Sequence, residues 1–221
     1  YQHGISLIEG VKKFDSLFAQ DVKQFIRSLV YPKNLPISFV NDASAFALGE
    51  YYAGAAHGSK RSLIVTLGTG FGSTFLIDGE IQQEAGNGVP ENGYLYHIPF
   101  GESIADDYFS TRWFVKRWKE KAGEEINGVR EIAGLAQQHN AIAIEVFVEF
   151  ANNLATFISP WLQQFRPDTL VIGGNIAKAS SLFIEQLNTL LRQSGVTSVN
   201  VYPCKLWENA PLIGAAMYAQ K

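Results

Sequence analysis

Two apolar runs separated by a glycine-rich turn constrain the fold of this sequence more than any other feature. Residues 63–67 are apolar apart from one threonine and lead into Gly68-Thr69-Gly70-Phe71-Gly72. A second run, residues 74–77, ends in Asp78-Gly79, a dipeptide typical of tight β-hairpins. We therefore predict two antiparallel strands joined by the glycine turn, followed by a third strand.

The remaining pattern alternates helices and strands. Apolar residues at helical spacing predict helices over residues 21–30, 104–120, 129–139, 141–165 and 175–192, and a small-residue helix over 43–56. Short apolar runs predict strands over residues 37–40, 169–172 and 199–202, and a closing helix follows Pro211. Asp21 with Gln24 is a capping pair for the first helix, and Pro160 should end or kink the helix that contains it. This order predicts a mixed α/β fold without internal repeats.

Composition excludes several classes of function. The chain has 221 residues, 47% of them hydrophobic, which is enough for a sizeable core. Its net charge of -3 and the lack of a Lys and Arg run argue against nucleic acid and anionic membranes as partners. The single Cys204 fits a reducing compartment, so we expect a cytoplasmic protein. No stretch approaches the ~20 apolar residues of a spanning helix. The start, Tyr1-Gln2, lacks both Met and a signal pattern, which suggests removed upstream residues or a fragment.

The glycine turn is the first candidate site. Without Cβ atoms at alternate positions, its backbone N–H groups can converge on an anion, and the Thr69 hydroxyl adds a donor for a phosphate oxygen. It is not a Walker loop, because no Gly-Lys-Ser/Thr follows and the glycines lead into a strand. The alternative is a plain glycine-rich hairpin turn.

A second candidate, Gly173-Gly174-Asn175, lies at the end of a predicted strand and the start of a helix. Free N–H groups and the positive end of a helix dipole suit nucleotide phosphates or the rim of an adenine pocket. The alternative is a sharp strand-to-helix turn with no ligand.

The third candidate is Asn41-Asp42, at the carboxyl end of a predicted strand, where α/β sheets bind ligands. The Asp42 carboxylate can take a proton from a substrate hydroxyl, as phosphoryl transfer to an alcohol requires, while Asn41 can bind a neighbouring hydroxyl. The alternative is that Asp42 caps the following helix, and the two roles are compatible.

The combination of these motifs resembles the ROK family of bacterial sugar kinases and regulators. A strand ending in Asn-Asp-Ala, one ending in Gly-Thr-Gly-x-Gly, one ending in Gly-Gly and a closing helix from Pro211 follow the family's order over nearly the whole chain. The resemblance implies an actin-like, ribonuclease H-like ATPase fold of two domains with the N-terminal one incomplete. It also implies Asp42 as catalytic base, Asn41 as a sugar ligand, and ATP with Mg²⁺. The implied phosphate and nucleotide residues are Gly68, Thr69, Gly70, Gly72, Gly173 and Gly174.

The sequence also departs from the family pattern. It has no Asp-x-Gly-Gly-Thr turn before Asn41, and the motif Gly-Glu-x-Gly-His is replaced by a segment in which Tyr94 takes the place of the sugar-binding Glu. His97 matches the motif's His. The cysteine-rich zinc loop is absent, so no zinc is expected, and Asp106 stands where relatives place a second sugar-binding Glu. Glu91 is an alternative to Tyr94 from a different backbone position, and Asp107 is an alternative to Asp106. The readings without a ligand are that His97 is a buried, backbone-bonded histidine and that Asp106 or Asp107 caps the helix that follows.

Two functions follow from the resemblance. The first is an ATP-dependent kinase of a hexose or amino sugar, binding its substrate through Asn41, Tyr94, His97 and Asp106, and forming a homodimer. The second is a non-catalytic sugar sensor of the same family. The predicted division is residues 1–45, with the closing helix 208–221, for the smaller domain and residues 46–207 for the larger one.

Overall fold

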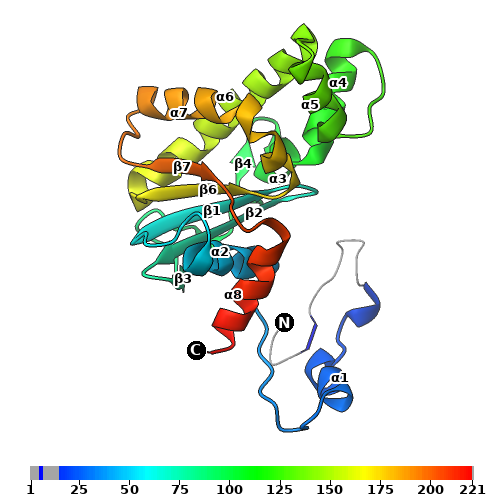
Figure 1. Ribbon diagram of the computed structural model, residues 1–221, viewed down its shortest axis with the longest axis vertical. Coiled ribbons are helices and arrows are strands. Elements are labelled where there is room, and N and C mark those ends of the chain that lie inside the picture. The colour runs from blue at the N-terminus through cyan, green and yellow to red at the C-terminus, as the bar shows by residue number, and fades with distance from the viewer. Residues whose placement is uncertain (1–4, 7–14, 221) are drawn as a thin grey trace.

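The computed structural model describes residues 5–6 and 15–220, and a five-stranded sheet forms its centre (Figure 1). The strand order is β3-β2-β1-β6-β7. Strand β2 pairs antiparallel with both β1 and β3, whereas β6 runs parallel to β1 and to β7. The strands are β1 (Arg61–Leu67), β2 (Phe71–Ile77), β3 (Glu80–Gln82), β6 (Thr169–Gly173) and β7 (Asn200–Pro203), with a separate hairpin of β4 (Pro99–Phe100) and β5 (Ser103–Ile104).

The predicted hairpins are confirmed. Leu67 pairs with Phe71 across the glycine turn, so β1 and β2 are joined by three residues. Between β2 and β3, Asp78 and Gly79 both have positive φ, 49° and 78°. A two-residue hairpin turn of type I′ requires positive φ at both positions, and Asp-Gly adopts it at low cost.

Helices cover both faces of the sheet. In Figure 1, α4 to α7 lie on one face, and α2 and α8 lie together on the other. The helices are α1 (Val22–Leu29), α2 (Asp42–Ala53), α3 (Ala105–Tyr108), α4 (Thr111–Ala122), α5 (Val129–Gln137), α6 (Ala141–Phe165), α7 (Ile184–Gln193) and α8 (Ala210–Tyr218). Short 3-10 segments are Asp15–Leu17, Glu91–Gly93, Asn175–Leu182 and Trp207–Asn209.

The pleat of β1 divides the core in two. Leu63 and Val65 belong to the larger apolar cluster, which includes the buried face of α6, while Ile64 between them belongs to the cluster under α2. Successive side chains of a strand point to opposite faces, so a strand that is apolar throughout indicates a sheet buried on both sides.

Helices α2 and α8 pack closely because glycines line their contact. A Cβ on Gly214 would lie 1.7 Å from the Ala45 carbonyl oxygen, and one on Gly49 would lie 2.0 Å from that of Ala210. This confirms the closely packed small-residue helix. Helix α2 also crosses the predicted domain boundary after residue 45, and the division into domains stays a prediction.

The predicted strand over residues 37–40 is not formed. These residues make no ladder with any part of the described chain. A strand is stabilised by its neighbour's backbone hydrogen bonds, and an apolar run that lacks such a neighbour stays irregular.

The predicted helix over residues 104–120 is two helices. It breaks after α3 because Phe109 turns fully into the core, and because both the backbone and the hydroxyl of Thr111 bond the Gly68 carbonyl. The predicted helix over 175–192 likewise divides into a 3-10 segment and α7. Pro160 does not end α6, which continues to Phe165.

Helix α6 corrects the expectation that no stretch is apolar enough to span a membrane. It meets that test by length and composition, with a mean hydropathy of 1.5 over its best window. Half of that window is buried inside the protein, and Phe147, Phe150 and Leu154 belong to the larger core cluster. The apolar character of α6 therefore matches its position in the core.

Candidate active site

A cavity of about 930 Å³ lies where the glycine turn meets the start of α2. Its walls come from the ends of β1 and β6, the start of β2, and the segments before and after the β4–β5 hairpin. Of the predicted site residues, it is lined by Asn41, Asp42, Gly68, Thr69, Gly70, Gly72, Tyr94, Asp106 and Gly174. His97 and Gly173 are not among its lining residues. The fold thus brings together residues that are far apart in sequence.

Asn41 and Asp42 form the N-terminus of α2. The Asn41 Oδ1 accepts hydrogen bonds from the backbone N–H of Ala43 at 3.0 Å and of Ser44 at 3.2 Å, so Asn41 is the N-cap. Asp42 is the first helical residue and is exposed, which corrects the alternative in which it caps the helix. Its Oδ1 accepts from the Ala43 N–H at 2.9 Å, and its Oδ2 has no partner among the described residues. One carboxylate oxygen therefore faces no competing group.

The carbonyl groups of the glycine turn are held by α4. The Gly68 oxygen accepts from the Thr111 N–H at 2.7 Å and from its hydroxyl at 3.0 Å, and the Thr69 oxygen accepts from Arg112 at 3.1 Å. By contrast, the N–H groups of Thr69 and Gly70 have no acceptor within the described part of the chain. Fixed carbonyls and unpaired N–H groups are what an anion-binding turn requires.

The glycines of the turn permit close approaches. A Cβ on Gly72 would lie 2.3 Å from the Thr66 hydroxyl and 2.9 Å from the Ala43 side chain, so this glycine lets α2 start next to the turn. A Cβ on Gly70 would lie 2.8 Å from an Asp106 carboxylate oxygen. Both positions thus have a packing reason beside any role in phosphate binding.

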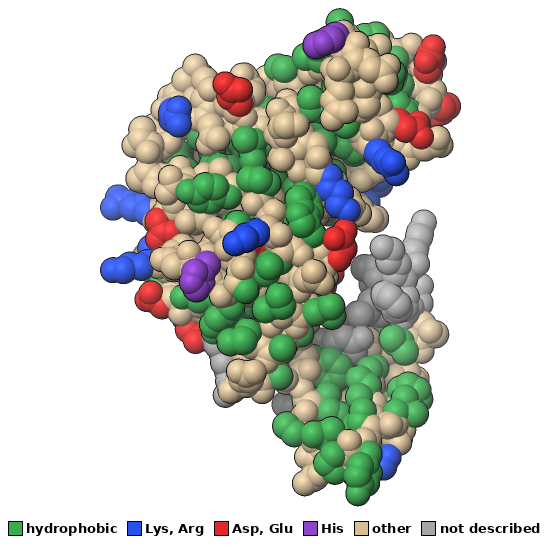
Figure 2. Space-filling view, in the orientation of Figure 1, with side chains coloured by type: hydrophobic (Ala, Val, Ile, Leu, Met, Phe, Trp, Pro, Cys, Tyr) green, Lys and Arg blue, Asp and Glu red, His purple; other side chains and the backbone are tan. Residues whose placement is uncertain are grey.

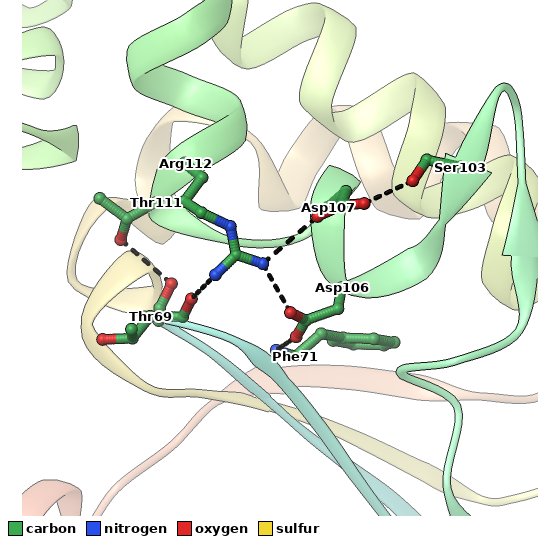
Figure 3. A network of polar contacts seen from close by, with 8 residues as sticks. Thr69, Phe71, Ser103, Asp106, Asp107, Thr111 and Arg112 are labelled. Atoms are coloured by element: carbon green, nitrogen blue, oxygen red, sulfur yellow. Dashed lines mark hydrogen bonds and ion pairs between the residues drawn. The ribbon is translucent and has the colours of Figure 1, made fainter. Parts of the chain in front are cut away.

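Asp106 joins the turn to α4. Its Oδ1 accepts from the Phe71 N–H at 2.6 Å and its Oδ2 from Arg112 at 2.6 Å (Figure 3). Asp107 lies 3.4 Å from the same guanidinium and accepts a hydrogen bond from Ser103. The bond to Asp106 raises the pKa of Arg112 above its already high usual value. Sequence reasoning missed Arg112, because its link to Asp106 runs across the break between two helices.

Gly173 and Gly174 have different roles. A Cβ on Gly173 would lie 2.4 Å from the Phe46 ring of α2, so this glycine allows the helix to pack on β6. Gly174 has φ of 82°, and a Cβ there would lie 2.3 Å from the Leu67 carbonyl oxygen. Gly174 and Asn175 line the cavity, whereas Gly173 does not. The sharp turn and a ligand role are therefore compatible at Gly174, while packing explains Gly173.

Tyr94 and Tyr96 supply the aromatic part of the cavity. Their ring centroids lie 6.0 Å apart, and the segment is fastened by Ser73, whose hydroxyl donates to the Gly93 carbonyl and accepts from the Leu95 N–H. Partial burial raises the pKa of Tyr94, and nearby Tyr96 and Asp42 raise it further. His97 is exposed, which overturns the alternative of a buried histidine. Tyr96 was not singled out from the sequence.

A second cavity of about 780 Å³ adjoins the first. Thr111 lines the second cavity and bonds Gly68 of the turn, and Asn175 lines both. The remaining walls come from α5, the residues before it and the 3-10 segment after β6, with Lys178 on the rim. No cluster of three or more His, Cys, Asp or Glu side chains suited to a metal ion occurs in residues 5–6 and 15–220.

The arrangement is that of an actin-like ATPase fold, in which a glycine turn between antiparallel strands faces a helix N-terminus. The family model described as "ROK family" matches residues 8–221, so the chain belongs to the ROK family. An uncharacterized protein of Clostridium perfringens is 31% identical over 168 residues, which are 75% of this chain and 56% of that protein. A glucokinase of Streptomyces coelicolor is 24% identical over 216 residues, covering 85% of this chain and 68% of the enzyme. The chain thus spans little more than half the length of the first of these relatives.

Solved structures confirm the fold. A ROK family glucokinase from Streptomyces griseus, in complex with glucose and AMPPNP, superposes with a TM-score of 0.76 at 22% identity, covering 92% of this chain and 73% of the enzyme. A ROK family transcriptional regulator, a homologue of the E. coli MLC protein, superposes with a TM-score of 0.78 at 20% identity, covering 92% of this chain and 56% of the regulator. Kinases and a regulator thus share the fold.

Proposed function

We propose that the protein transfers the γ-phosphoryl group of ATP to a hydroxyl of a hexose or amino sugar. The observation that supports this most is that Asp42 lines one cavity with Thr69 and Gly70, whose N–H groups have no acceptor among the described residues. A carboxylate that accepts a proton and a turn that binds phosphate are the two parts that phosphoryl transfer to an alcohol needs. The relationship to a glucokinase supports the same reaction.

Each side chain at the base of the cavity has a distinct role. Asp42 Oδ2, which has no other partner among the described residues, accepts the proton of the attacking hydroxyl. The side-chain Oδ1 of Asn41 already accepts the two hydrogen bonds of the helix cap. The side-chain NH₂ group is therefore the part left to donate to a neighbouring sugar hydroxyl. Tyr94, His97 and Asp106 remain predicted sugar ligands, although Asp106 is already bonded to Phe71 and Arg112 and His97 lies outside the cavity lining.

The residues present fit the phosphates of ATP. The Thr69 and Gly70 N–H groups can donate to a phosphate, Gly174 lies beside them, and the adjoining cavity has room for the nucleoside. If bound, Mg²⁺ would neutralise charge on the phosphates, and Asp42 and Asp106 are the carboxylates of the cavity lining that could hold it.

On the basis of the family relationship, we also propose the domain organisation of the protein, its assembly and its cellular location. The chain forms the larger part of a two-domain enzyme, with residues 1–45 and the closing helix in the smaller domain and residues 46–207 in the larger. The enzyme is a cytoplasmic homodimer without zinc.

A sugar sensor is the second candidate, and Tyr94 favours it. Tyr94 lines the cavity beside Asp42 where the family pattern has a carboxylate, and a phenol binds sugar hydroxyls less strongly than a charged acceptor does. A regulator with the same fold supports this reading as well. In the sensor, sugar binding is independent of ATP and no turnover follows.

One experiment separates the two functions. Full-length protein is incubated with Mg-ATP and a panel of hexoses and amino sugars, and ADP release is measured with wild type and Asp42→Asn. The kinase predicts sugar-dependent ADP release that the variant lowers. Sugar binding by calorimetry that is unchanged by ATP, with no ADP released by wild type, supports the sensor and overturns the kinase.

A further inference from the structure

The cavity has a charge imbalance that its phosphate ligand must overcome. Asp42 and Asp106 contribute two carboxylates to the lining, and Arg112 is the one cation among the described residues that line it. At neutral pH the side chains of the lining therefore carry a net charge of about -1, and the loss of Arg112 would make it about -2. A triphosphate adds several negative charges to this site.

Arg112 lies next to the turn and is partly exposed, so its guanidinium can interact with the negative charge of a triphosphate. Its NH1 donates to the Thr69 carbonyl at 3.1 Å, so the guanidinium lies next to the residue whose N–H we assign to phosphate. The side chain keeps 55% of its surface exposed, and Figure 3 shows it held between α3 and the turn. A planar guanidinium can bind carboxylate and phosphate oxygens at the same time, which a lysine ammonium cannot do in fixed geometry.

Arg112 is also linked to both ends of the turn. It bonds Thr69 directly, and through Asp106 it is linked to the Phe71 N–H at the other end of the turn. The first contact occupies the Thr69 carbonyl and the second the Phe71 N–H, while the Thr69 and Gly70 N–H groups between them have no acceptor among the described residues.

We infer that Arg112 is a phosphate-binding residue of this chain, which fixes the glycine turn and contributes positive charge to the polyphosphate of a nucleoside triphosphate. This rests on the proposed function, because it assigns the turn to phosphate. Asp107, at 3.4 Å, is a second and weaker anchor that keeps the guanidinium near the turn.

The test compares a ligand with phosphates to one without. Binding of Mg-AMPPNP and of adenosine to full-length wild type, Arg112→Gln and Arg112→Lys is measured by calorimetry, with thermal unfolding as a check on folding. We expect Arg112→Gln to weaken AMPPNP binding about tenfold or more and to leave adenosine binding within about twofold. Arg112→Lys keeps the positive charge but cannot bind the carboxylate and a phosphate oxygen at the same time in fixed geometry. We therefore expect it to lose less AMPPNP affinity than Arg112→Gln does.

The outcomes separate this inference from the proposed function. If wild type binds AMPPNP and both variants bind it equally well, Arg112 has no such role and the kinase proposal stands. If both ligands weaken in parallel, Arg112 acts only on folding and the inference is wrong. If wild type binds neither ligand, the nucleotide site itself is refuted. Should Arg112→Gln fail to fold, Arg112→Lys against wild type gives the same comparison.

Discussion

The two walls of the cavity differ in how firmly they are held. The phosphate wall, the turn from Gly68 to Gly72, is bonded to Thr111, Arg112 and Asp106 of a neighbouring helical segment. The base wall, Asn41 and Asp42 with Tyr94, is exposed or half-buried. Within the described residues, the Asp42 carboxylate bonds only the adjacent N–H of Ala43. Under the proposed function, we therefore expect changes at the phosphate wall to affect stability as well as binding, and changes at the base wall to affect turnover.

The largest expected effect is at the base wall. Asp42→Asn removes the proton acceptor but keeps a similar shape, so we expect sugar-dependent turnover to fall by at least ~10²-fold. The free energy of unfolding should change little, because Asp42 is exposed and makes one local bond. Coupled ADP assays and urea unfolding measure the two quantities. Equal turnover of variant and wild type would remove Asp42 from the mechanism.

At the phosphate wall, Gly174→Ala tests how tightly the ends of β1 and β6 meet. The new Cβ would lie 2.3 Å from the Leu67 carbonyl oxygen at a φ of 82°, and we expect a loss of roughly 3 kcal/mol in unfolding free energy. Gly58→Ala is the matched control, because Gly58 has a φ of 81° and nothing within 4 Å of its added Cβ. That control should lose only about 1 kcal/mol. Equal losses would show that backbone conformation alone, and not the close approach, constrains Gly174.

Asp106→Asn sharpens the comparison at the turn itself. The amide keeps one acceptor but loses the charge that strengthens the bond to the Phe71 N–H, now 2.6 Å long. We expect hydrogen exchange at that N–H to accelerate about fivefold, which corresponds to roughly 1 kcal/mol. Asp107→Asn is the control, since Asp107 does not bond the turn, and its effect on Phe71 should be below about twofold. Equal acceleration in both variants would mean that Asp106 does not hold the turn.

The smallest effect is expected at Tyr94. Its pKa is raised above the usual 10.0, so the phenol keeps its proton from about pH 6 to 9 and should add no limb to the pH dependence of kcat/KM there. Tyr94→Phe should change turnover by less than about threefold and leave that profile unchanged. Because the folded state binds this proton more tightly, the stabilising contribution is present below pH 10.0 and is lost as the pH rises further. A profile altered near neutral pH in the variant would contradict this.

The elements that could be predicted from the sequence are those determined by residues close together in the chain. Asp78-Gly79 is typical of a hairpin turn with positive φ at both residues, and both have positive φ in the structure. A closing helix was predicted after Pro211, and α8 is present there. The glycines at the ends of β1 and β6 could also be predicted, because these strands follow from apolar runs. Asn41 and Asp42 were assigned to the end of a strand that is not formed, and only the start of a helix at this point is confirmed.

The structural features that could not be predicted from the sequence depend on contacts between segments that are far apart in the chain. The apolar run at residues 37–40 has strand composition, but pairing decides whether a strand forms. The break at Phe109 is caused by burial and by the bonds from Thr111 to Gly68. Arg112 became a candidate only once the turn lay beside α4, and His97 proved exposed although its motif position suggested the site.

The central claim is that Asp42 and the glycine turn act on one substrate pair, and a crystal structure of the full-length protein with Mg-AMPPNP and an accepted sugar tests it most directly. We expect a sugar hydroxyl within about 3 Å of an Asp42 carboxylate oxygen and the γ-phosphate on the N–H groups of Thr69 and Gly70. Phosphates bound away from the turn, or a sugar without contact to Asp42, would contradict the claim.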